Sequence, residues 1–327
     1  MRIDRVIKEL VKLFLLLVLV IVILYSGMKV LDATALYGEA EPAGLRTTKT
    51  IVRDGQAYFP RQDITVVMVL GIDRSGPVES SNYYRNDGSA DTVMLLVFDE
   101  TEKNCTVLNL NRDTMVDMDV LGVRGEPAGT DYGQLGLAHT YGTGLEDSCE
   151  NVRNTLMHFI HGLTVDYYVA MNMDALAVLN DAVGGVTVTV TEDFSQVNPT
   201  ITLGELTLMG DQALDYVRSR KEVGDQKNIT RMERQEAYVT GFLEALKVKE
   251  QADANFALEV YEQVAPYVVS DCSATTLTSM LERYTEYEVR EVVTPEGENT
   301  IVDGYYEFHV DEEKMDSLIL ELFYRPK

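Results

Sequence analysis

The sequence has few of the residues that bind transition metals. Its 327 residues include three cysteines and four histidines, and none of them forms a Cys-x-x-Cys or His-rich pattern. Zinc sites use such patterns, so we expect no zinc site here. Cys105, Cys149 and Cys272 allow one disulfide with one thiol left over, but their spacing does not say which pair forms, or whether any does.

Basic residues are also scarce. The chain has 28 Lys and Arg against 53 Asp and Glu, which gives a net charge of −25 at pH 7. A surface of this charge repels polyanions, so nucleic acid is excluded as a partner. There is no internal repeat, low-complexity tract or linker between residues 63 and 327, and a hydrophobic content of 46% is sufficient for a core. We therefore expect one domain over residues 63–327.

The N-terminus differs from the rest of the chain. An apolar run from Leu13 to Tyr25 follows four basic residues within the first twelve. With its flanks the run has about the length that crosses a bilayer, and the basic residues place the N-terminus in the cytoplasm. We expect a cytoplasmic tail (1–12), a transmembrane anchor (13–31) and an extracytoplasmic stalk (32–62), hence a single-pass protein of the cell membrane whose domain lies outside. A cleaved signal peptide ending near Ala33-Thr34-Ala35 is the alternative, which Lys29 and Asp32 fit poorly.

Nearly continuous apolar segments predict three buried strands, at Ile64–Ile72, Thr92–Phe98 and Cys105–Leu110. The polar residues 99–104 predict an antiparallel hairpin between the second and third strands. If the first strand lies beside them, Asp73, Asp91 and Arg112 meet at one edge of the sheet. Two carboxylates near an arginine suit Mg²⁺ and a phosphate group. Asp at strand ends is equally typical of ordinary turns, so both interpretations stay open here.

Helices and strands alternate along the rest of the domain. Asp174 is expected to cap a helix that stops at Gly184-Gly185, and a strand follows at Val186–Val190. A helix or turn from Gly210 leads to Arg218 and Arg220. Further elements are expected as helices at 231–246, 256–264, 275–284 and 311–323 and as a strand at 288–293.

One window of this acidic chain is rich in arginine. Residues 218–234 carry six basic and three acidic side chains, and the basic ones include Arg218, Arg220, Arg231 and Arg234. Thr230 and Glu233 form a capping box that starts a helix near Arg231, and a helix N-terminus attracts anions. Guanidinium groups bind phosphate oxygens two at a time, so the window favours a pyrophosphate site. Surface ion pairs, which contribute about 0–1 kcal/mol each, are the alternative.

Short motifs connect these segments to a known family. In order along residues 63–250 they are Leu70-Gly-Ile-Asp73, Ala90-Asp91-Thr92, Asn111-Arg112-Asp113-Thr114, Ala138-His-Thr-Tyr141-Gly142, Val165-Asp-Tyr-Tyr168, Val183-Gly-Gly185-Val, Ala213-Leu-Asp-Tyr-Val-Arg218-Ser-Arg220, Gly224-Asp225 and Arg231-Met-Glu-Arg234-Gln235. In this order, behind a single N-terminal anchor, they resemble the LytR-CpsA-Psr proteins of bacterial cell envelopes.

The resemblance implies a fold and an activity. The fold would be α/β, a three-layer α/β/α sandwich with a mixed central β-sheet, with its motif core at 63–250 and C-terminal elements at 251–327. The enzyme would be a phosphotransferase that moves a glycopolymer phosphate, such as teichoic acid or capsular polysaccharide, from a polyprenyl (undecaprenyl) pyrophosphate carrier to a peptidoglycan sugar hydroxyl.

The resemblance also implies site residues. Asp73 and Asp91 would hold Mg²⁺, and the catalytic group would consist of Asp91, Arg112, Arg218 and Arg220. The pyrophosphate would be bound by Arg112, Arg218, Arg220, Arg231, Arg234 and Gln235. An apolar tunnel lined in part by residues 169–179 would take the polyprenyl chain.

The sequence departs from the family pattern in three places. Gly88-Ser89-Ala90 stands before Asp91 where the family usually has Arg and Ser, Asn111 replaces a proline, and Gln134-Leu135-Gly136 replaces a segment with Lys and Asn. Arg85 is the candidate to replace the missing arginine. Because positive charge has been lost, two alternatives stay open: a polyprenyl pyrophosphate phosphatase that uses water as acceptor, and a non-catalytic anchored protein that binds or regulates lipid-linked polymer.

Overall fold

The computed structural model describes residues 50–219 and 287–326, together with 223, 234, 237–238, 240–242, 244–246, 248–249, 256, 260, 263–272, 276, 280 and 283–284.

The centre of the domain is a six-stranded mixed sheet. The strands lie in the order β11 (Val268–Ser270), β8 (Tyr167–Asn172), β3 (Ile64–Ile72), β4 (Ala90–Asp99), β5 (Asn104–Leu110) and β12 (Glu288–Val293). β3, β4 and β5 are antiparallel neighbours, whereas β8 runs parallel to β3 and β12 parallel to β5. The mixed sheet and the β4–β5 hairpin, both expected from the sequence, are confirmed.

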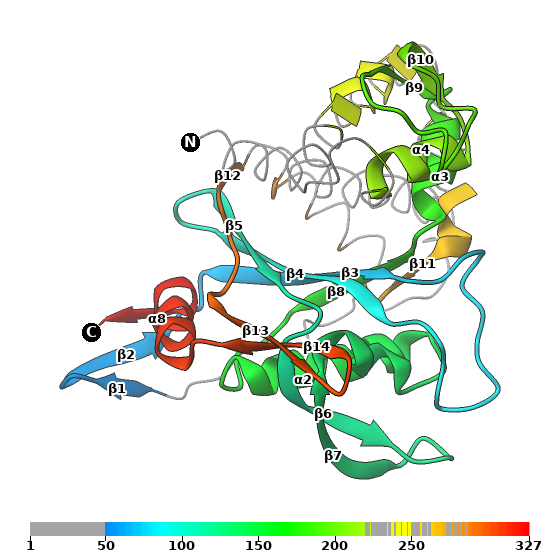
Figure 1. The fold of residues 1–327 in the computed structure, drawn as a ribbon. Coiled ribbons are helices and arrows are strands. Elements are labelled where there is room, and N and C mark those ends of the chain that lie inside the picture. The colour runs from blue at the N-terminus through cyan, green and yellow to red at the C-terminus, as the bar shows by residue number, and fades with distance from the viewer. Residues whose placement is uncertain are drawn as a thin grey trace, which may run out of the picture.

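Helices cover both faces of the sheet, because β3, β4 and β5 carry apolar side chains on both sides. One face packs against α3 (Ala175–Ala182) and α4 (Asp211–Arg218). The other packs against α2 (Glu146–Phe159) and α8 (Glu312–Phe323). Figure 1 shows the two helix pairs on opposite sides, and we call the two sides the α4 face and the α2 face. Val169, Met171, Ala175 and Leu179, expected to line a lipid tunnel, are buried in the core of the α4 face.

Smaller elements surround this core. They are the hairpins β6 (Met115–Leu121)–β7 (Pro127–Gln134), β9 (Val186–Val190)–β10 (Gly204–Leu208) and β13 (Gly297–Val302)–β14 (Tyr305–Val310), and the short 3-10 helices η1 (Leu135–Thr140) and η2 (Ala265–Tyr267). The strands expected at 186–190 and 288–293 and the helix expected at 311–323 are confirmed. All three cysteines are buried and free, so the described structure contains no disulfide between them.

The start and the end of the domain pair with each other. Hairpin β1 (Ile51–Arg53)–β2 (Gln56–Pro60) forms a three-stranded sheet with β15 (Tyr324–Pro326). The sequence places residues 51–60 in the stalk, and the structure attaches them to the C-terminus of the domain. The tail, the anchor and the rest of the stalk lie outside the described residues. In the part that is described, no helix is long and apolar enough to cross a bilayer.

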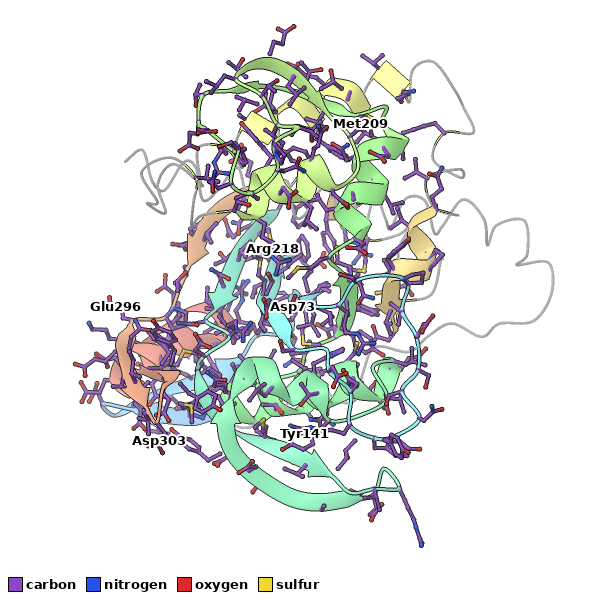
Figure 2. All side chains as sticks on the ribbon, turned by 45° about the vertical axis from the view of Figure 1, so that its right-hand side comes forward. Asp73, Tyr141, Met209, Arg218, Glu296 and Asp303 are labelled. Atoms are coloured by element: carbon purple, nitrogen blue, oxygen red, sulfur yellow. The ribbon has the colours of Figure 1, made fainter. Side chains whose placement is uncertain are left out.

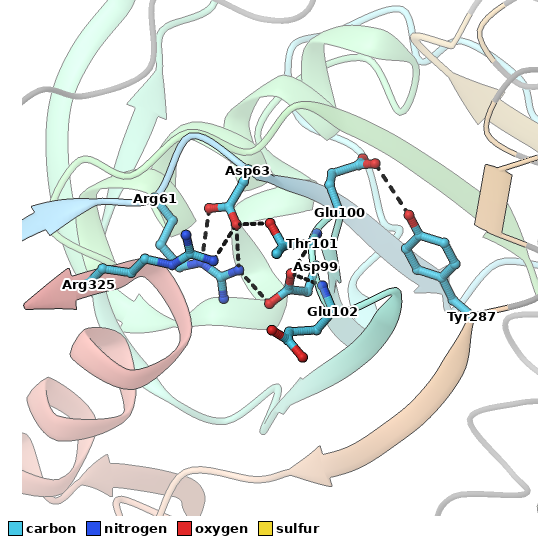
Figure 3. A network of polar contacts seen from close by, with 8 residues as sticks. All are labelled: Arg61, Asp63, Asp99, Glu100, Thr101, Glu102, Tyr287 and Arg325. Atoms are coloured by element: carbon cyan, nitrogen blue, oxygen red, sulfur yellow. Dashed lines mark hydrogen bonds and ion pairs between the residues drawn. The ribbon is translucent and has the colours of Figure 1, made fainter.

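A charged network fastens this terminal sheet to the β4–β5 turn (Figure 3). Arg61 pairs with Asp63 at 3.1 Å and also bonds the Asp99 carboxylate, and the side chains of Arg61 and Asp99 are each only 11% exposed. Arg325 bonds the same Asp63 from β15, and its side chain is 52% exposed. Burial opposes ionisation of Asp63, but hydrogen bonds from Arg61 and Thr101 outweigh it and lower the pKa to about 2. The pKa of Asp99 is lowered too, because the Glu102 amide and Arg61 outweigh the effect of burial.

We expect Arg61→Met to lower the free energy of unfolding by about 1–3 kcal/mol, because it leaves the Asp99 carboxylate buried without its cation. The matched control is Arg325→Met, which removes an exposed partner of the same network and should cost less than about 1 kcal/mol. Both carboxyls have lowered pKa values in the fold, so the pairing stabilises the fold above about pH 4 and is lost as the pH falls toward about 2. Urea denaturation at pH 7, 4 and 2.5 checks this. If the difference in the free energy of unfolding between Arg61→Met and the parent protein does not shrink at low pH, the stabilising role of these ion pairs is contradicted.

Candidate active site at the end of the central sheet

Asp73 and Asp91 lie at the same end of adjacent strands, on the same face. In the β3–β4 ladder Gly71 pairs with Thr92 and Ile72 pairs with Ala90, so Asp91 is an extra residue with no partner. Val93 and Ala90 both belong to the core of the α2 face, although strict alternation would put them on opposite faces. This β-bulge turns Asp91 away from the α2 face and toward the α4 face, where Asp73 also points by alternation along β3. The Asp73 amide bonds the Ser89 carbonyl at 2.9 Å and fixes the two ends together.

Arg112 completes the group from the end of β5. Its Nη1 bonds Asp91 Oδ1, and its Nε lies 3.5 Å from Asp113 Oδ1. Ser89 Oγ donates to the same Asp91 oxygen at 3.2 Å. Asn111, in place of the family's proline, accepts the Asp113 amide on its side chain at 3.0 Å and so forms the turn that presents Arg112. The meeting of Asp73, Asp91 and Arg112 expected from the sequence is confirmed.

Glycine allows the backbone to approach Arg112 closely. The Gly136 amide donates to the Arg112 carbonyl at 2.8 Å. A Cβ at this position would lie 2.7 Å from the Ala90 carbonyl oxygen and 3.2 Å from the Arg112 Cβ. The departure from the family pattern at residues 134–136 therefore has a packing reason, because only glycine fits between the strand ends that carry Asp91 and Arg112.

The loop between β3 and β4 is fixed by side chains from β8 and α3. Asp174 Oδ2 accepts the Gly76 amide at 2.7 Å, and Asn172 Nδ2 donates to the Gly76 carbonyl at 2.9 Å. Asp174 takes the expected N-cap position of α3, but its side chain makes no capping bond to that helix. The carboxylate holds the loop that follows Asp73 instead.

A buried polar network supports the segment before Asp91 from below. Asn86 Nδ2 donates to the His139 carbonyl at 2.8 Å, and Asn86 Oδ1 accepts the Gly88 amide at 2.7 Å. His139 Nδ1 lies 2.7 Å from the Gly88 carbonyl, which makes Nδ1 the protonated nitrogen. Burial lowers the pKa of His139, so the ring is neutral in the fold. His139 therefore acts on the site through Gly88 and not by contact with a ligand.

Arg218 reaches the site from the α4 face. It is the last residue of α4, and its Nη2 lies 3.5 Å from Asp73 Oδ1. The Arg218 side chain is 55% exposed, so most of its donors face solvent. Figure 2 shows Arg218 directly above Asp73, between the helical layer and the end of the sheet.

Arg234 occupies a different environment. Its side chain is 6% exposed and pairs through Nε with Glu192 at 2.7 Å, at an angle outside that of a hydrogen bond. Its other nitrogens donate to the carbonyls of Tyr216 and Ser219, which are unsatisfied carbonyls at the end of α4. The guanidinium also lies 5.0 Å from the Phe194 ring centroid. Arg234 thus caps the helix that carries Arg218, and each of its three side-chain nitrogens faces a protein acceptor.

Arg220, Arg231 and Gln235, together with the capping box at 230–233, lie outside the described residues. Arg85, the candidate for the missing arginine, is exposed and stacks over the Tyr141 ring at 3.9 Å. Arg74, which was not among the predicted site residues, follows Asp73 directly and packs against Gly88, where a Cβ would lie 2.9 Å from the Arg74 Cγ. Ser89 was likewise not predicted as a partner of Asp91. Their positions beside the two aspartates were the available signal.

The donor set fits a hard cation. In the part of the chain that the structure describes, Oδ2 of Asp73 and Oδ2 of Asp91 make no hydrogen bond or ion pair. Among the described residues, no three or more His, Cys, Asp or Glu side chains are placed so that they could hold a metal ion together. Two carboxylates with neighbouring guanidiniums match Mg²⁺, which completes its shell with waters and phosphate oxygens.

Comparison with known proteins identifies relatives along most of the chain. The LytR_cpsA_psr family model matches residues 35–323. The polyisoprenyl-teichoic acid–peptidoglycan teichoic acid transferase TagU of Enterococcus faecalis is 29% identical over 237 residues, which are 71% of this chain and 71% of that protein. TagU of Bacillus subtilis is 25% identical over 281 residues, covering 84% of this chain and 82% of its own length.

Solved structures share the fold. TagT of B. subtilis has a TM-score of 0.54 at 22% identity and covers 88% of this chain and 98% of its own. A structure described as TagT bound to LI-WTA has a TM-score of 0.53 at 23% identity and covers 80% of this chain and 90% of its own. At this identity the two structures support the fold alone.

We expect Arg234→Met to lower the free energy of unfolding by about 3–5 kcal/mol, because it leaves Glu192 buried without a cation. Arg218→Met is the matched control: it removes an exposed arginine from the helix that Arg234 caps and should change stability by less than about 1 kcal/mol. Glu192→Gln combined with Arg234→Met should recover part of the loss. Chemical denaturation measures all three, and an Arg234→Met protein as stable as the parent would show that Arg234 is not a structural residue.

The buried neutral His139 predicts a pH dependence of stability. Its pKa is lowered in the fold from about 6.5. The unfolded chain therefore binds a proton at a higher pH than the folded chain does, and the free energy of unfolding falls as the pH drops below about 6.5. The slope reaches at most about 1.4 kcal/mol per pH unit. His139→Gln should show a flatter stability curve between pH 7 and pH 5, while His158→Gln, at an exposed position, should follow the parent curve. Equal slopes for all three proteins would rule out the neutral buried ring.

Proposed function

The chain belongs to the LytR-CpsA-Psr family, and we propose that it transfers a wall glycopolymer, as its phosphate, from a polyprenyl pyrophosphate carrier to peptidoglycan. Transfer is supported by the TagU relatives, whose names state a teichoic acid transferase acting between a polyisoprenyl-linked polymer and peptidoglycan. The carrier lipid and the anchoring of the chain in the cell membrane rest on the resemblance and on the apolar run at residues 13–31.

One observation carries the proposal: two carboxylate–guanidinium contacts, Asp91 with Arg112 and Asp73 with Arg218, lie at one end of the sheet on its α4 face. They come from four separate elements, and Arg112 and Arg218 are the exposed arginines of the group, with 38% and 55% of their side chains accessible. A surface of net charge −25 disfavours anions elsewhere. Phosphoryl transfer needs mainly positioning and cancellation of charge, which this group supplies.

Each residue of this group has a role in the proposed reaction that follows from its position. Arg112 and Arg218 bind oxygens of the pyrophosphate, and the family resemblance adds Arg220, Arg231 and Gln235 as further ligands of it. Mg²⁺ held by Asp73 and Asp91 would neutralise the remaining phosphate charge. The sugar hydroxyl oxygen forms a new bond to the phosphorus that bears the glycopolymer, the bond from that phosphorus to the bridging oxygen breaks, and polyprenyl phosphate leaves. The hydroxyl proton passes to Asp91 or to solvent beside it.

Asp91→Asn should lower the transfer rate by about 10²–10³-fold, because a neutral amide would hold Mg²⁺ weakly and cannot accept the hydroxyl proton. Asp73→Asn should have a smaller effect on rate and raise the Mg²⁺ concentration needed for half-maximal activity. Asp54→Asn, in the β1–β2 turn at positive φ where Asn is tolerated, is the matched control and should retain full activity. The assay supplies lipid-linked polymer, purified peptidoglycan and Mg²⁺, and measures polymer bound to peptidoglycan together with polymer phosphate released into solution.

Three outcomes decide between the alternatives. Polymer on peptidoglycan that is lost with Asp91→Asn supports transfer. Polymer phosphate released into solution as the main product identifies a phosphatase that uses water as acceptor. Carrier binding with no Mg²⁺-dependent product identifies an anchored binding protein. Either of these two results overturns the proposal.

A further inference from the structure

Two hollows in the surface next to the candidate site meet at one strand. The near hollow has a volume of about 630 Å³, and its lining includes Asn111, the residue before Arg112. The far hollow has a volume of about 500 Å³, and its lining includes Tyr132 of β7. His309 and Val310 of β14 line both hollows. Each has the volume of an ordinary ligand pocket, and we call the two together the groove.

Strand pairing places the near hollow at the same end of the sheet as the candidate site. β12 runs parallel to β5 and ends at Val293, which pairs with Leu108, so residues 294–298 continue beside the end of β5 that leads to Arg112. Glu298 of this segment lines the near hollow. Within the described part of the chain its carboxylate makes no hydrogen bond or ion pair, so it is available to a ligand.

Both walls of the groove are fixed to the loop that carries Arg112. Met115, the first residue of β6, lines the far hollow. It pairs with Gln134, whose side chain donates to Asp113 Oδ1 at 3.0 Å. β14 lies beside β6 (Figure 1), and its Phe308 amide donates to the Asp113 carbonyl at 2.8 Å. A ligand in the groove is therefore held by elements that share their attachment with the candidate site.

The lining of the far hollow combines aromatic and acidic side chains. Tyr132 and Asp117 are a cross-strand pair of the β6–β7 hairpin, so they stand on the same face of it. Tyr132 is 57% exposed, and Phe159 at the end of α2 lines the same hollow. Among the described residues, the side chains of Tyr132 and Asp117 have no hydrogen-bond or ion-pair partner. A flat aromatic face and a hydrogen-bond acceptor suit the C–H face and the hydroxyl groups of a pyranose.

The charge of the groove selects the kind of ligand. Among the described residues, each hollow is lined by three acidic side chains, against a single lysine, Lys314, in the near one. That lysine is itself paired with Glu296 and Asp311. A polyanionic glycopolymer is repelled by such a lining, whereas uncharged sugar rings are not. Of the two polymers in the proposed reaction, the groove fits the glycan strand of the acceptor.

We propose that the groove binds the glycan strand of peptidoglycan, with the reacting sugar in the near hollow and the neighbouring sugars in the far hollow. The proposal rests on the proposed function, because it names the binding surface for the acceptor of that reaction. Glu298 accepts hydrogen bonds from the sugar beside Arg112, and Tyr132 stacks on a sugar farther along the strand. A strand that fills both hollows thus binds more tightly than one that fills only the near hollow.

The test uses one variant in each hollow, Glu298→Ala and Tyr132→Ser. Tyr305→Ser is the matched control, because Tyr305 is 71% exposed, also belongs to a hairpin strand and lines neither hollow. All three positions are exposed, so the fold should be retained, and a thermal melt verifies it. One readout is co-sedimentation of the full chain with purified peptidoglycan sacculi stripped of wall polymers. The other is the KM for the lipid-linked donor, for a peptidoglycan disaccharide and for a long glycan fragment.

We expect Tyr132→Ser to raise the KM for the long fragment about tenfold, as for loss of a central aromatic contact, and to leave the KM for the disaccharide unchanged. Its binding to sacculi should weaken by a similar factor. Glu298→Ala should raise both acceptor KM values about fivefold, as for one lost hydrogen bond. The donor KM should stay at the parent value in both variants, and Tyr305→Ser should behave as the parent throughout.

Parent-like sacculus binding by Tyr132→Ser overturns the groove, even if transfer to peptidoglycan is intact. An equal rise of both acceptor KM values in Tyr132→Ser also overturns it, because the residue then acts through the fold. The same holds if the parent self-associates and Tyr132→Ser does not, because the far hollow then joins two copies of the chain. If the parent binds sacculi through Tyr132 but transfers no polymer, the groove stands and the proposed reaction is refuted.

Discussion

The unpaired position of Asp91 in the β3–β4 ladder is the constraint on which the candidate site depends. With regular pairing, alternation would direct Asp91 to the α2 face beside Val93 and Leu95, which are fully buried. An ionised carboxylate in such a core costs several kcal/mol, so the site would be lost and the fold weakened together. The bulge avoids that cost by turning the carboxylate to the end of the sheet where Asp73 and Arg112 meet it. Gly136 below and Asn86 with His139 behind hold the bulged segment in this geometry.

The arginines near the candidate site differ in how deeply they are buried and in what they contact. Arg234 pairs with Glu192 and donates hydrogen bonds to carbonyls at the end of α4. A guanidinium suits this position because its planar fork can face several acceptors at once. Arg112 and Arg218 keep accessible surface and face carboxylates that a phosphate can replace as partners. The buried arginine positions the helix, and the helix positions the exposed arginine. In the arginine-rich window, Arg234 therefore supports the helix and Arg218 stays exposed at the end of that helix.

The sequence predicted the part of the fold in which local pattern and tertiary environment agree. The apolar runs at 64–72, 92–98 and 105–110 became β3, β4 and β5, because strands buried on both faces need apolar side chains on both. That topology brings Asp73, Asp91 and Arg112 to one end of the sheet, whereas the bulge that turns Asp91 toward the α4 face was not predicted from the sequence. Strands β7 and β13 escaped notice because they are exposed and polar, PAGTDYGQ and GENTIV, and carry no hydrophobic alternation. Asp174 looked like a helix cap, yet its carboxylate bonds the Gly76 amide of a loop nearly a hundred residues away, which no local pattern contains.

Charge also bears on the proposed reaction. In that proposal the carrier and its polymer are anionic, and the guanidiniums that would attract them come from α4 and from the end of β5. Hairpin residues 297–310 carry three acidic and no basic side chains, so the hairpin would disfavour an anionic donor. Screening at physiological salt limits each field to about 8 Å, so attraction at the strand ends and repulsion at the hairpin can coexist within one domain.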